Sequence, residues 1–172
     1  MGGGGPSTLY DPVMSALDVA VARELGFDVL RENDECRTSA AGGRVLMFMP
    51  HCCRRLYSNA IEANWAAGAL PRLAILGNSF ASYAERVTGD DSGCRVLLAA
   101  SRGVVREQPV GAAYEPTNVL NDTSLHTFRA AGGADEPLPP ITQTSEADYI
   151  SKEAVPTGFI NLSAGERCRG AP

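Results

Sequence analysis

Several polar side chains of this sequence have the types and positions expected of a binding site in an open α/β sheet. Most of them come directly after apolar runs that we predict to be strands, and the rest come from a later strand-like segment. They are Asp11, His51, Cys52, Asn78, Ser79, Asp122 and His126. Because ligands of open α/β sheets bind beyond the carboxyl ends of the strands, we expect these residues to line one crevice.

His51 is the candidate for acid–base chemistry, since an unperturbed imidazole titrates near neutral pH. Together with Cys52 it could offer soft ligands to a metal or to haem iron. Adjacent residues of an extended chain point to opposite faces, so we do not expect both side chains to reach one metal. The alternative is that His51 fixes its loop by hydrogen bonds, while Cys53 packs in the core.

Asp11 follows a short predicted strand, at the position where Rossmann-type folds place an acid on a ribose hydroxyl. The alternative is that Asp11 and Pro12 turn the chain into the next helix, with the carboxylate ordering the turn. Ser79 is expected to cap a helix. The free backbone N–H groups at the start of that helix would suit an anion such as a phosphate, although ordinary capping needs no ligand.

Three further residues are expected to be structural. Trp65 continues a helical apolar row that includes Tyr57, so it should pack in the core. Asn64 is placed to cap the end of that helix. Gly77 lies at the end of the second apolar run, directly before Asn78 and Ser79.

No sequence signature of catalysis or metal binding is present, so the catalytic residues stay unassigned. Ser79, Asp122 and His126 do not predict a catalytic triad, because the motif around Ser79 is GNSF and lacks the GxSxG elbow. Zinc-ligand spacing and a Walker loop are also missing from the sequence.

The elements that must position these residues follow from the apolar pattern. Residues 45–49 and 73–76 are apolar runs without alternation, as in parallel strands that are buried on both faces. A segment with helical spacing lies between them, and a second one begins after Ser79. This order predicts an α/β fold with a three-layer, Rossmann-like and mostly parallel sheet and right-handed crossovers.

Weaker signals flank this central unit. A helix should begin at Ser15, whose spacing to Asp18 fits a capping box, and should end at Gly26. The other predicted elements, in chain order, are short strands at 8–10 and 27–30, a hairpin-like loop at 31–43, a helix at 94–101 and strand-like segments at 104–110 and 120–128.

The chain divides into three parts by composition. Residues 1–7 are a flexible Gly-rich leader, and residues 8–128 are long enough for one domain with its own core. From residue 129 to residue 172, Pro, Gly, Ser, Thr and acidic residues dominate without a sustained apolar period. That tail is predicted to be disordered.

Composition also argues against several classes of partner. The formal net charge of −5 does not favour a nucleic-acid backbone. No apolar run approaches the roughly 20 residues that span a bilayer, so we expect no membrane partner. The five Cys residues are odd in number and form no CxxC pair, which favours reduced thiols and a soluble protein of the cytoplasm, the nucleus or both.

Five motifs occur in an order that resembles the SRR-like domain family, named for "sensitivity to red light reduced". They are YDPV at 10–13, MPHC at 49–52, NW at 64–65, GNSF at 77–80 and NDTSLH at 121–126. The resemblance covers roughly residues 9 to 128. Members usually carry, upstream of YDPV, a strand ending in a Gly-x-Gly-Ser-like turn. The resemblance therefore implies an N-terminally truncated domain and an incomplete sheet.

The resemblance implies a regulatory function. Members are connected with circadian timing and light signalling in plants, and relatives in animals and fungi with haem metabolism, proliferation and cytoskeletal stability. No agreed reaction comes with the family. We therefore expect a regulator that acts through protein partners and a small ligand rather than an enzyme. The alternatives are a Rossmann-type enzyme or binder for a nucleotide-containing cofactor, and a haem-binding regulator.

Overall fold

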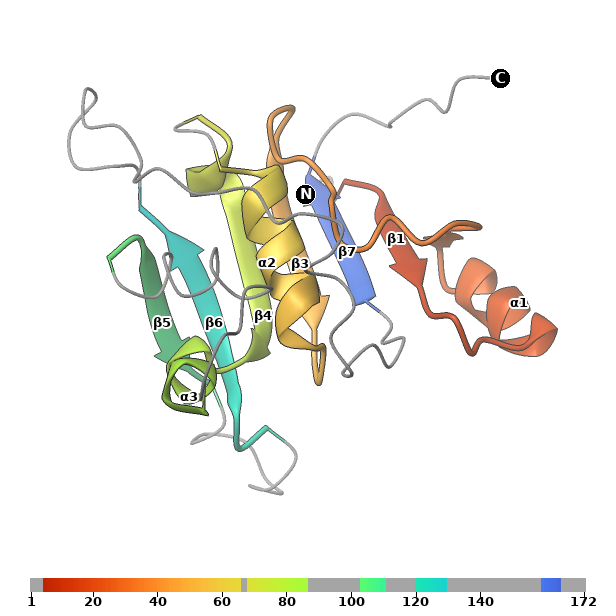
Figure 1. Ribbon diagram of the computed structural model, residues 1–172. Helices are drawn as coiled ribbons and strands as arrows, with labels where there is room; N and C mark the ends of the chain where they lie inside the picture. The colour runs from red at the N-terminus through yellow and green to blue at the C-terminus, as the bar shows by residue number, and fades with distance from the viewer. Residues whose placement is uncertain (1–4, 66–67, 87–102, 111–119, 130–158, 165–172) are drawn as a thin grey trace, which may run out of the picture.

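The computed structural model describes residues 5–65, 68–86, 103–110, 120–129 and 159–164 (Figure 1). The elements are β1 (Ser7–Tyr10), α1 (Ala16–Glu24), β2 (Phe27–Val29), β3 (Arg44–Met49), α2 (Arg54–Ala63), a 3₁₀ turn (Leu70–Arg72), β4 (Leu73–Asn78), α3 (Phe80–Arg86), β5 (Val105–Pro109), β6 (Thr123–Phe128) and β7 (Phe159–Ala164). The strands predicted within 8–10, 27–30, 45–49, 73–76, 104–110 and 120–128 are confirmed. The helix predicted at 94–101 lies outside the described residues.

The described strands form one mixed sheet in the order β2-β1-β7-β3-β4-β6-β5. The parallel pairs are β1 with β2 and β3 with β4, and a helix connects the two strands of each pair. The other pairings, which β6 and β7 make with their neighbours, are antiparallel. The prediction of a mostly parallel sheet is therefore wrong, because only the two helix-linked pairs provide the crossover that parallel strands need.

The described helices do not confirm the expected three-layer Rossmann-like arrangement. In Figure 1, α2 and α3 lie in front of the sheet, whereas α1 lies at its outer edge beside β2. The loop at 31–43 is confirmed as a loop, but it is not a hairpin. It joins β2 at the sheet edge to β3, and these strands are not neighbours.

Strand β7 corrects the expectation of a disordered tail. Residues Phe159–Ala164 lie between β1 and β3 and are hydrogen-bonded to both. A strand with a partner on each side is stabilised by its backbone hydrogen bonds, so it needs no long apolar period of its own. The rest of the predicted tail beyond Arg129 lies outside the described residues.

Helix α1 forms for the local reasons that its sequence indicates. Ser15 and Asp18 make the complete capping box, in which Asp18 Oδ2 accepts the Ser15 N–H at 2.8 Å. These hydrogen bonds lower the pKa of Asp18, because they favour its charged form. Gly26 follows the helix with a φ of 89°, a left-handed conformation that favours glycine.

The core lies between α2 and the central strands. In β3 and β4 buried residues alternate with half-buried ones, so Met47 and Ile75 are buried while Phe48 is not. Tyr57 and Ile61 of α2 are fully buried against this side of the sheet. The unbroken apolar runs predicted strands that are buried on both faces, whereas one face of β3 and β4 is covered more completely than the other.

Candidate functional site

The ends of β3 and β4 are joined through Asn78, the last residue of β4. Its side-chain Oδ1 accepts the backbone N–H of His51 at 2.6 Å, and its own backbone N–H donates to the Tyr57 hydroxyl at 2.9 Å. The Tyr57 hydroxyl also contacts Asn78 Oδ1 at 3.1 Å and donates to the Met49 carbonyl. We call Met49, His51, Tyr57 and Asn78 the Asn78 clamp.

Tyr57 sits at the buried centre of the Asn78 clamp. Burial raises the pKa of its hydroxyl, and the hydrogen bond from Asn78 works in the opposite direction. The group therefore stays protonated and acts as both donor and acceptor at neutral pH. Its ring also packs on the rings of Phe80 and Tyr83, with centroids 5.4 and 5.8 Å away. The clamp thus links α2 to the first turn of α3.

Asp122 brings the start of β6 to the same edge. Its backbone carbonyl accepts the Ser79 N–H at 2.9 Å, and its Oδ1 accepts the Ser82 hydroxyl at 3.0 Å. Asn78 Nδ2 lies 3.5 Å from Asp122 Oδ2. Ser79 Oγ in turn accepts the Ser82 N–H at 3.1 Å, which confirms the predicted helix cap. The structure therefore brings together the predicted residues at the exits of β3 and β4 with Asp122.

His51 is held by its backbone and exposes its side chain. Its φ is 57°, a left-handed conformation that is uncommon for residues other than glycine. The next residue, Cys52, is 1 % exposed, so one of the two neighbouring side chains faces solvent and the other faces the core. The sequence predicted that they point to opposite faces. With Cys52 buried and His51 exposed, the pair cannot ligate one metal or haem iron together. The exposed imidazole is the group of the Asn78 clamp that a partner can reach.

Asp11 lies at the same edge of the sheet as His51, but two strands away from it. Its Oδ1 accepts the Val13 N–H at 2.9 Å, which orders the turn into α1. Strand β7 separates β1 from β3, so the ends of β1 and β3 are two strand spacings, or roughly 10 Å, apart. The interpretation of Asp11-Pro12 as a turn is confirmed, and the expectation that Asp11 lines one crevice with His51 and Asn78 stays a prediction.

His126 lies inside the core, in β6. It is fully buried and stacks on Phe80 with ring centroids 3.6 Å apart. Nδ1 lies 3.2 Å from the Ile75 carbonyl, which can only accept, so Nδ1 carries the proton. Nε2 faces Glu107 Oε2 at 3.7 Å and has no hydrogen-bond partner. Because this side chain is enclosed, it cannot contact a ligand at the surface in this conformation.

The buried imidazole predicts a pH-dependent stability. Burial lowers the pKa of His126 below its usual value, and Glu107 opposes this shift only in part. The unfolded chain therefore binds a proton near pH 6.5 that the folded chain does not bind. We expect the free energy of unfolding to fall as the pH drops from 7.5 to 5.5, by at most about 1.4 kcal/mol, because about one pH unit of this range lies below the pKa of the unfolded chain. Urea denaturation at both pH values measures this loss.

The chain offers a matched control, because it has only two His residues. The His126→Gln variant should lose most of the stability difference between the two pH values, whereas His51→Gln should keep it. If His126→Gln retains the full difference, another group is responsible and the assignment to His126 is wrong.

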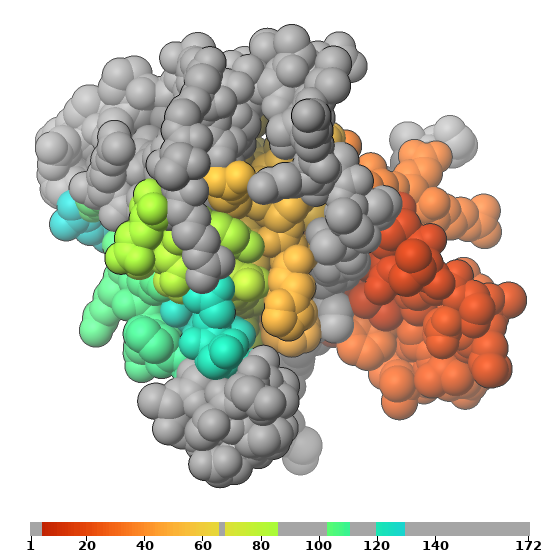
Figure 2. All heavy atoms as spheres, turned by 60° about the horizontal axis from the view of Figure 1, so that its bottom comes forward, coloured from red at the N-terminus to blue at the C-terminus, as the bar shows by residue number. Residues whose placement is uncertain are grey.

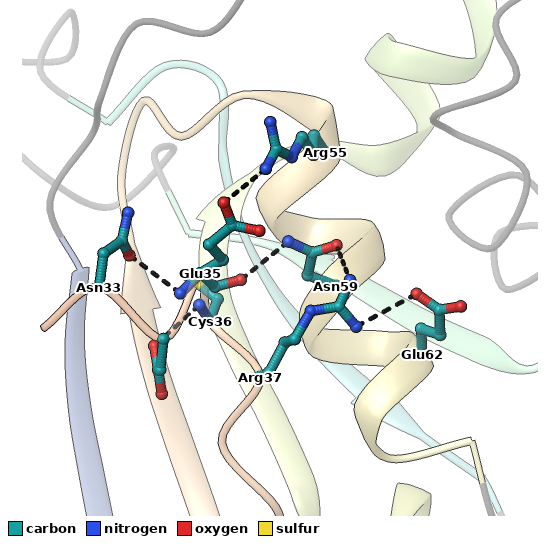
Figure 3. A network of polar contacts seen from close by, with 8 residues as sticks. Asn33, Glu35, Cys36, Arg37, Arg55, Asn59 and Glu62 are labelled. Atoms are coloured by element: carbon teal, nitrogen blue, oxygen red, sulfur yellow. Dashed lines mark hydrogen bonds and ion pairs between the residues drawn. The ribbon is translucent and has the colours of Figure 1, made fainter. Parts of the chain in front are cut away.

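A second polar network fixes the loop before β3 to α2 (Figure 3). Arg55 and Glu35 form an ion pair at 2.5 Å, and Asn59 Nδ2 donates to the Glu35 carbonyl at 3.0 Å. Arg37 reaches Asn59 Oδ1 at 3.0 Å and Glu62 at 3.5 Å. Sequence patterns do not single out these residues as a network. The only signal is the helical spacing that places Arg55, Asn59 and Glu62 on one side of α2.

The loop in this network has an unusual backbone. Glu35 and Cys36 have φ values of 52° and 64°, and the side chains of Asn33 and Asp34 accept their backbone N–H groups at 2.9 Å each. Cys36 is fully buried beneath the loop, and burial raises the pKa of its thiol. The thiol is therefore protonated and poorly reactive, which indicates a packing role.

The residues predicted as structural have that role. Asn64 is fully buried, and its side chain donates to the Ala60 carbonyl at 2.8 Å and to the Thr38 carbonyl at 2.9 Å. It therefore caps the end of α2, as predicted, and also holds the loop before β3. Trp65 is half-buried against the core. Gly77 lies directly beneath Tyr57, so close that a Cβ atom would be 2.6 Å from the hydroxyl oxygen.

Across the ranges that the structure describes, His, Cys, Asp and Glu side chains do not gather in groups of three or more that could hold a metal ion. None of the helices in those ranges has both the length and the apolar character that a membrane span requires.

Comparison with known proteins identifies the family of this chain. The SRR1 domain matches residues 5–127, a range that includes the whole Asn78 clamp and Asp122. The chain belongs to the SRR1 domain family. In this SRR1 domain, the MPHC segment contains Met49 and His51. The GNSF segment contains Asn78, which is hydrogen-bonded to His51. The NDTSLH segment contains Asp122.

Relatives of this SRR1 domain occur in plants and animals. "Protein SENSITIVITY TO RED LIGHT REDUCED 1" of Arabidopsis thaliana is 33% identical over 138 residues, which are 76% of this chain and 48% of that protein. "SRR1-like protein" of Mus musculus is 44% identical over 79 residues, 46% of this chain and 32% of that protein. "SRR1-like protein" of Drosophila melanogaster is 34% identical over 84 residues, 48% of this chain and 29% of that protein.

The chain spans about half the length of the Arabidopsis relative and about a third of each animal relative that it matches. No solved structure matches this SRR1 domain.

Proposed function

We propose that this chain is a regulatory protein of light signalling and circadian timing that acts by binding other proteins at the Asn78 clamp. Membership of the SRR1 domain family supports a regulatory role, and the name of the Arabidopsis relative refers to sensitivity to red light. The observation that carries the proposal is His51, an exposed side chain on a turn that the clamp holds in a left-handed conformation. The proposed location is the cytoplasm, the nucleus or both.

The physical argument rests on the cost of that conformation. A left-handed backbone at a residue other than glycine costs of the order of 1 kcal/mol, and it persists only when surrounding contacts hold it. Here the contact is the 2.6 Å hydrogen bond from the His51 N–H to Asn78. A turn fixed in this way presents the imidazole in one position, so a partner that binds it does not have to order the turn first.

A genetic test separates the role of His51 from the stability of the domain. An Arabidopsis line that lacks the relative would express this chain as wild type, as His51→Ala or as Arg44→Ala. Arg44 is an exposed matched control at the opposite end of β3. We expect the wild type and Arg44→Ala to restore the seedling response to red light, and His51→Ala to restore little of it at an equal protein level.

Two results would count against the proposal. A wild-type chain that restores nothing contradicts the role in light signalling. A His51→Ala chain that restores the full response contradicts the use of the Asn78 clamp as the binding surface. Thermal unfolding of the purified variants provides the check on folding, because an exposed side chain should change the melting temperature little.

A further inference from the structure

Glu107 connects the edge strand β5 to the first turn of α3. Its Oε2 accepts the backbone N–H of Ala81 at 3.1 Å. Ala81 is the second residue of α3, and a backbone N–H in the first turn of a helix has no partner within the helix. Glu107 therefore supplies the acceptor that this N–H lacks and fixes the start of α3, directly after the end of β4.

The same oxygen of Glu107 faces a second group, the imidazole of His126. The two residues are direct partners in the register of β5 and β6. Glu107 Oε2 lies 3.7 Å from His126 Nε2. In the neutral ring Nδ1 carries the proton, so Nε2 presents a lone pair to an oxygen that also has only lone pairs. Nε2 becomes a donor to this oxygen only when the ring is protonated.

The surroundings of the pair make Glu107 the partner that moves. The imidazole is enclosed, with the Ile75 carbonyl at Nδ1 and the ring of Phe80 stacked on it at 3.6 Å between centroids. The side chain of Glu107 is 18% exposed, and among the described strands β5 pairs with β6 alone. Figure 2 shows green residues of β5 at the surface, next to turquoise residues of β6.

Glu107 is also the charge that acts on His126. Burial lowers the pKa of the imidazole, and Glu107 is the described ionisable group whose charge opposes this shift. From β4 and α3 the ring is contacted by the uncharged Ile75 and Phe80. The 3₁₀ turn near β6 carries Arg72, whose guanidinium donates to a backbone carbonyl of the loop before β3 at 2.7 Å. A proton on His126 therefore acts mainly on Glu107.

We propose that His126 and Glu107 form a proton-operated switch of the Asn78 clamp. When Nε2 takes up a proton from water, the pair closes from 3.7 Å to the roughly 2.8 Å of a charge-assisted hydrogen bond. The carboxylate oxygen thus moves by about 0.9 Å. Helix α3 cannot follow it, because Asp122 accepts hydrogen bonds from Ser79 and Ser82 at 2.9 and 3.0 Å. The start of α3 therefore loses its hydrogen bond to Glu107.

Phe80 carries this change to the Asn78 clamp. It is the first residue of α3, and its ring lies between His126, on which it stacks, and Tyr57, whose ring centroid is 5.4 Å away. Tyr57 is the buried centre of the clamp, so a looser start of α3 also loosens the turn at His51. The switch itself depends only on these contacts. Its use, which is weaker binding of a partner at acidic pH, rests on the proposed function.

NMR spectroscopy of the full 172-residue chain without a partner tests the switch. The imidazole signals of His126 give the pH at which the folded chain takes up the proton. Amide hydrogen exchange is then measured one pH unit above and below this midpoint, and it is expressed as protection factors relative to the most protected amides of β3 and β4. These core amides correct for global unfolding.

Protonation should lower the relative protection factor of the Ala81 amide about 10-fold, the ratio that corresponds to one lost hydrogen bond. The His51 amide should lose about threefold, because its acceptor is loosened and not removed.

Two variants and a matched control connect the effect to the pair. His126→Gln removes the titratable ring, so Ala81 and His51 should keep their relative protection at both pH values. Glu107→Gln keeps an oxygen for the Ala81 N–H but removes the charge that favours a protonated imidazole, so His126 should stay neutral at both pH values. Arg106→Gln removes a charge from an exposed position of the same strand and should respond to pH like the wild type.

Three results would overturn the proposal. His126 stays neutral down to the pH at which the chain unfolds, which would show that the pair does not close. His126 takes up the proton while Ala81 and His51 keep their relative protection, which would exclude the coupling to the clamp. His126→Gln responds to pH like the wild type, which would assign the effect to another group. None of these results bears on the proposed function, which the response of seedlings to red light tests separately.

Discussion

The Gly77→Ala variant is expected to lose about 3 kcal/mol of its free energy of unfolding, the cost of overpacking a rigid site. A Cβ atom at this position would lie 2.6 Å from the Tyr57 hydroxyl oxygen and 2.8 Å from the Met49 carbonyl oxygen. Both atoms belong to the Asn78 clamp and are hydrogen-bonded to each other, so neither can move without breaking a buried contact. Urea denaturation followed by circular dichroism measures the loss.

Two controls make this prediction specific. Gly68→Ala adds the same methyl group where no atom lies within 4 Å, so it should change the stability by no more than about 0.5 kcal/mol. Tyr57→Phe removes the nearest clashing atom, so Gly77→Ala should cost less in that background. A cost of Gly77→Ala that matches Gly68→Ala would show that the clamp is looser than the structure describes.

The second large effect is expected at Asn78 itself. Asn78→Ala removes the acceptor for the His51 N–H, and it also removes the side-chain contacts to Tyr57 and Asp122. We expect a loss of about 2 kcal/mol in the free energy of unfolding, because partly buried partners are left without hydrogen bonds. The exposed Asn121→Ala is the matched control and should cost little.

Two further measurements assign that loss to the clamp. The amide of His51 should exchange its hydrogen faster in Asn78→Ala than in the wild type, since its acceptor is gone. A double-mutant cycle with Tyr57→Phe should give a coupling energy of about 1 kcal/mol, because both residues act in one network. An unchanged exchange rate together with additive effects would contradict the role of Asn78 as the joint between β3 and β4.

Local signals in the sequence were enough to place most of the described elements. The Ser15–Asp18 capping box, the apolar runs of β3 and β4 and the Ser79 cap each act within a few residues. The sequence could also predict that the polar residues at the ends of β3 and β4 lie close together, since parallel neighbouring strands end at the same edge of a sheet.

Contacts between distant segments could not be predicted in the same way. Tyr57 was assigned to a helical apolar row, and nothing in its neighbourhood shows that its hydroxyl reaches Asn78, which is 21 residues away. The burial of His126 depends on Phe80 and Ile75, which come from other elements. The exposure of the apolar residues of α1 could not be predicted for a related reason. A helical apolar row has the same sequence pattern whether it faces a core or solvent.

The position of β7 has a consequence for the order in which the protein can form. Among the described strands, β1 and β2 are hydrogen-bonded to the rest of the sheet only through β7, which pairs Leu9 with Ile160. Such a link between segments that are so far apart in the sequence closes a very long loop, which makes it slow to form. A ribosome releases the N-terminal end of a chain first, so β1 and β2 cannot pair with the rest of the sheet until β7 has emerged. The sheet is therefore completed only after the chain has been synthesised as far as Ala164.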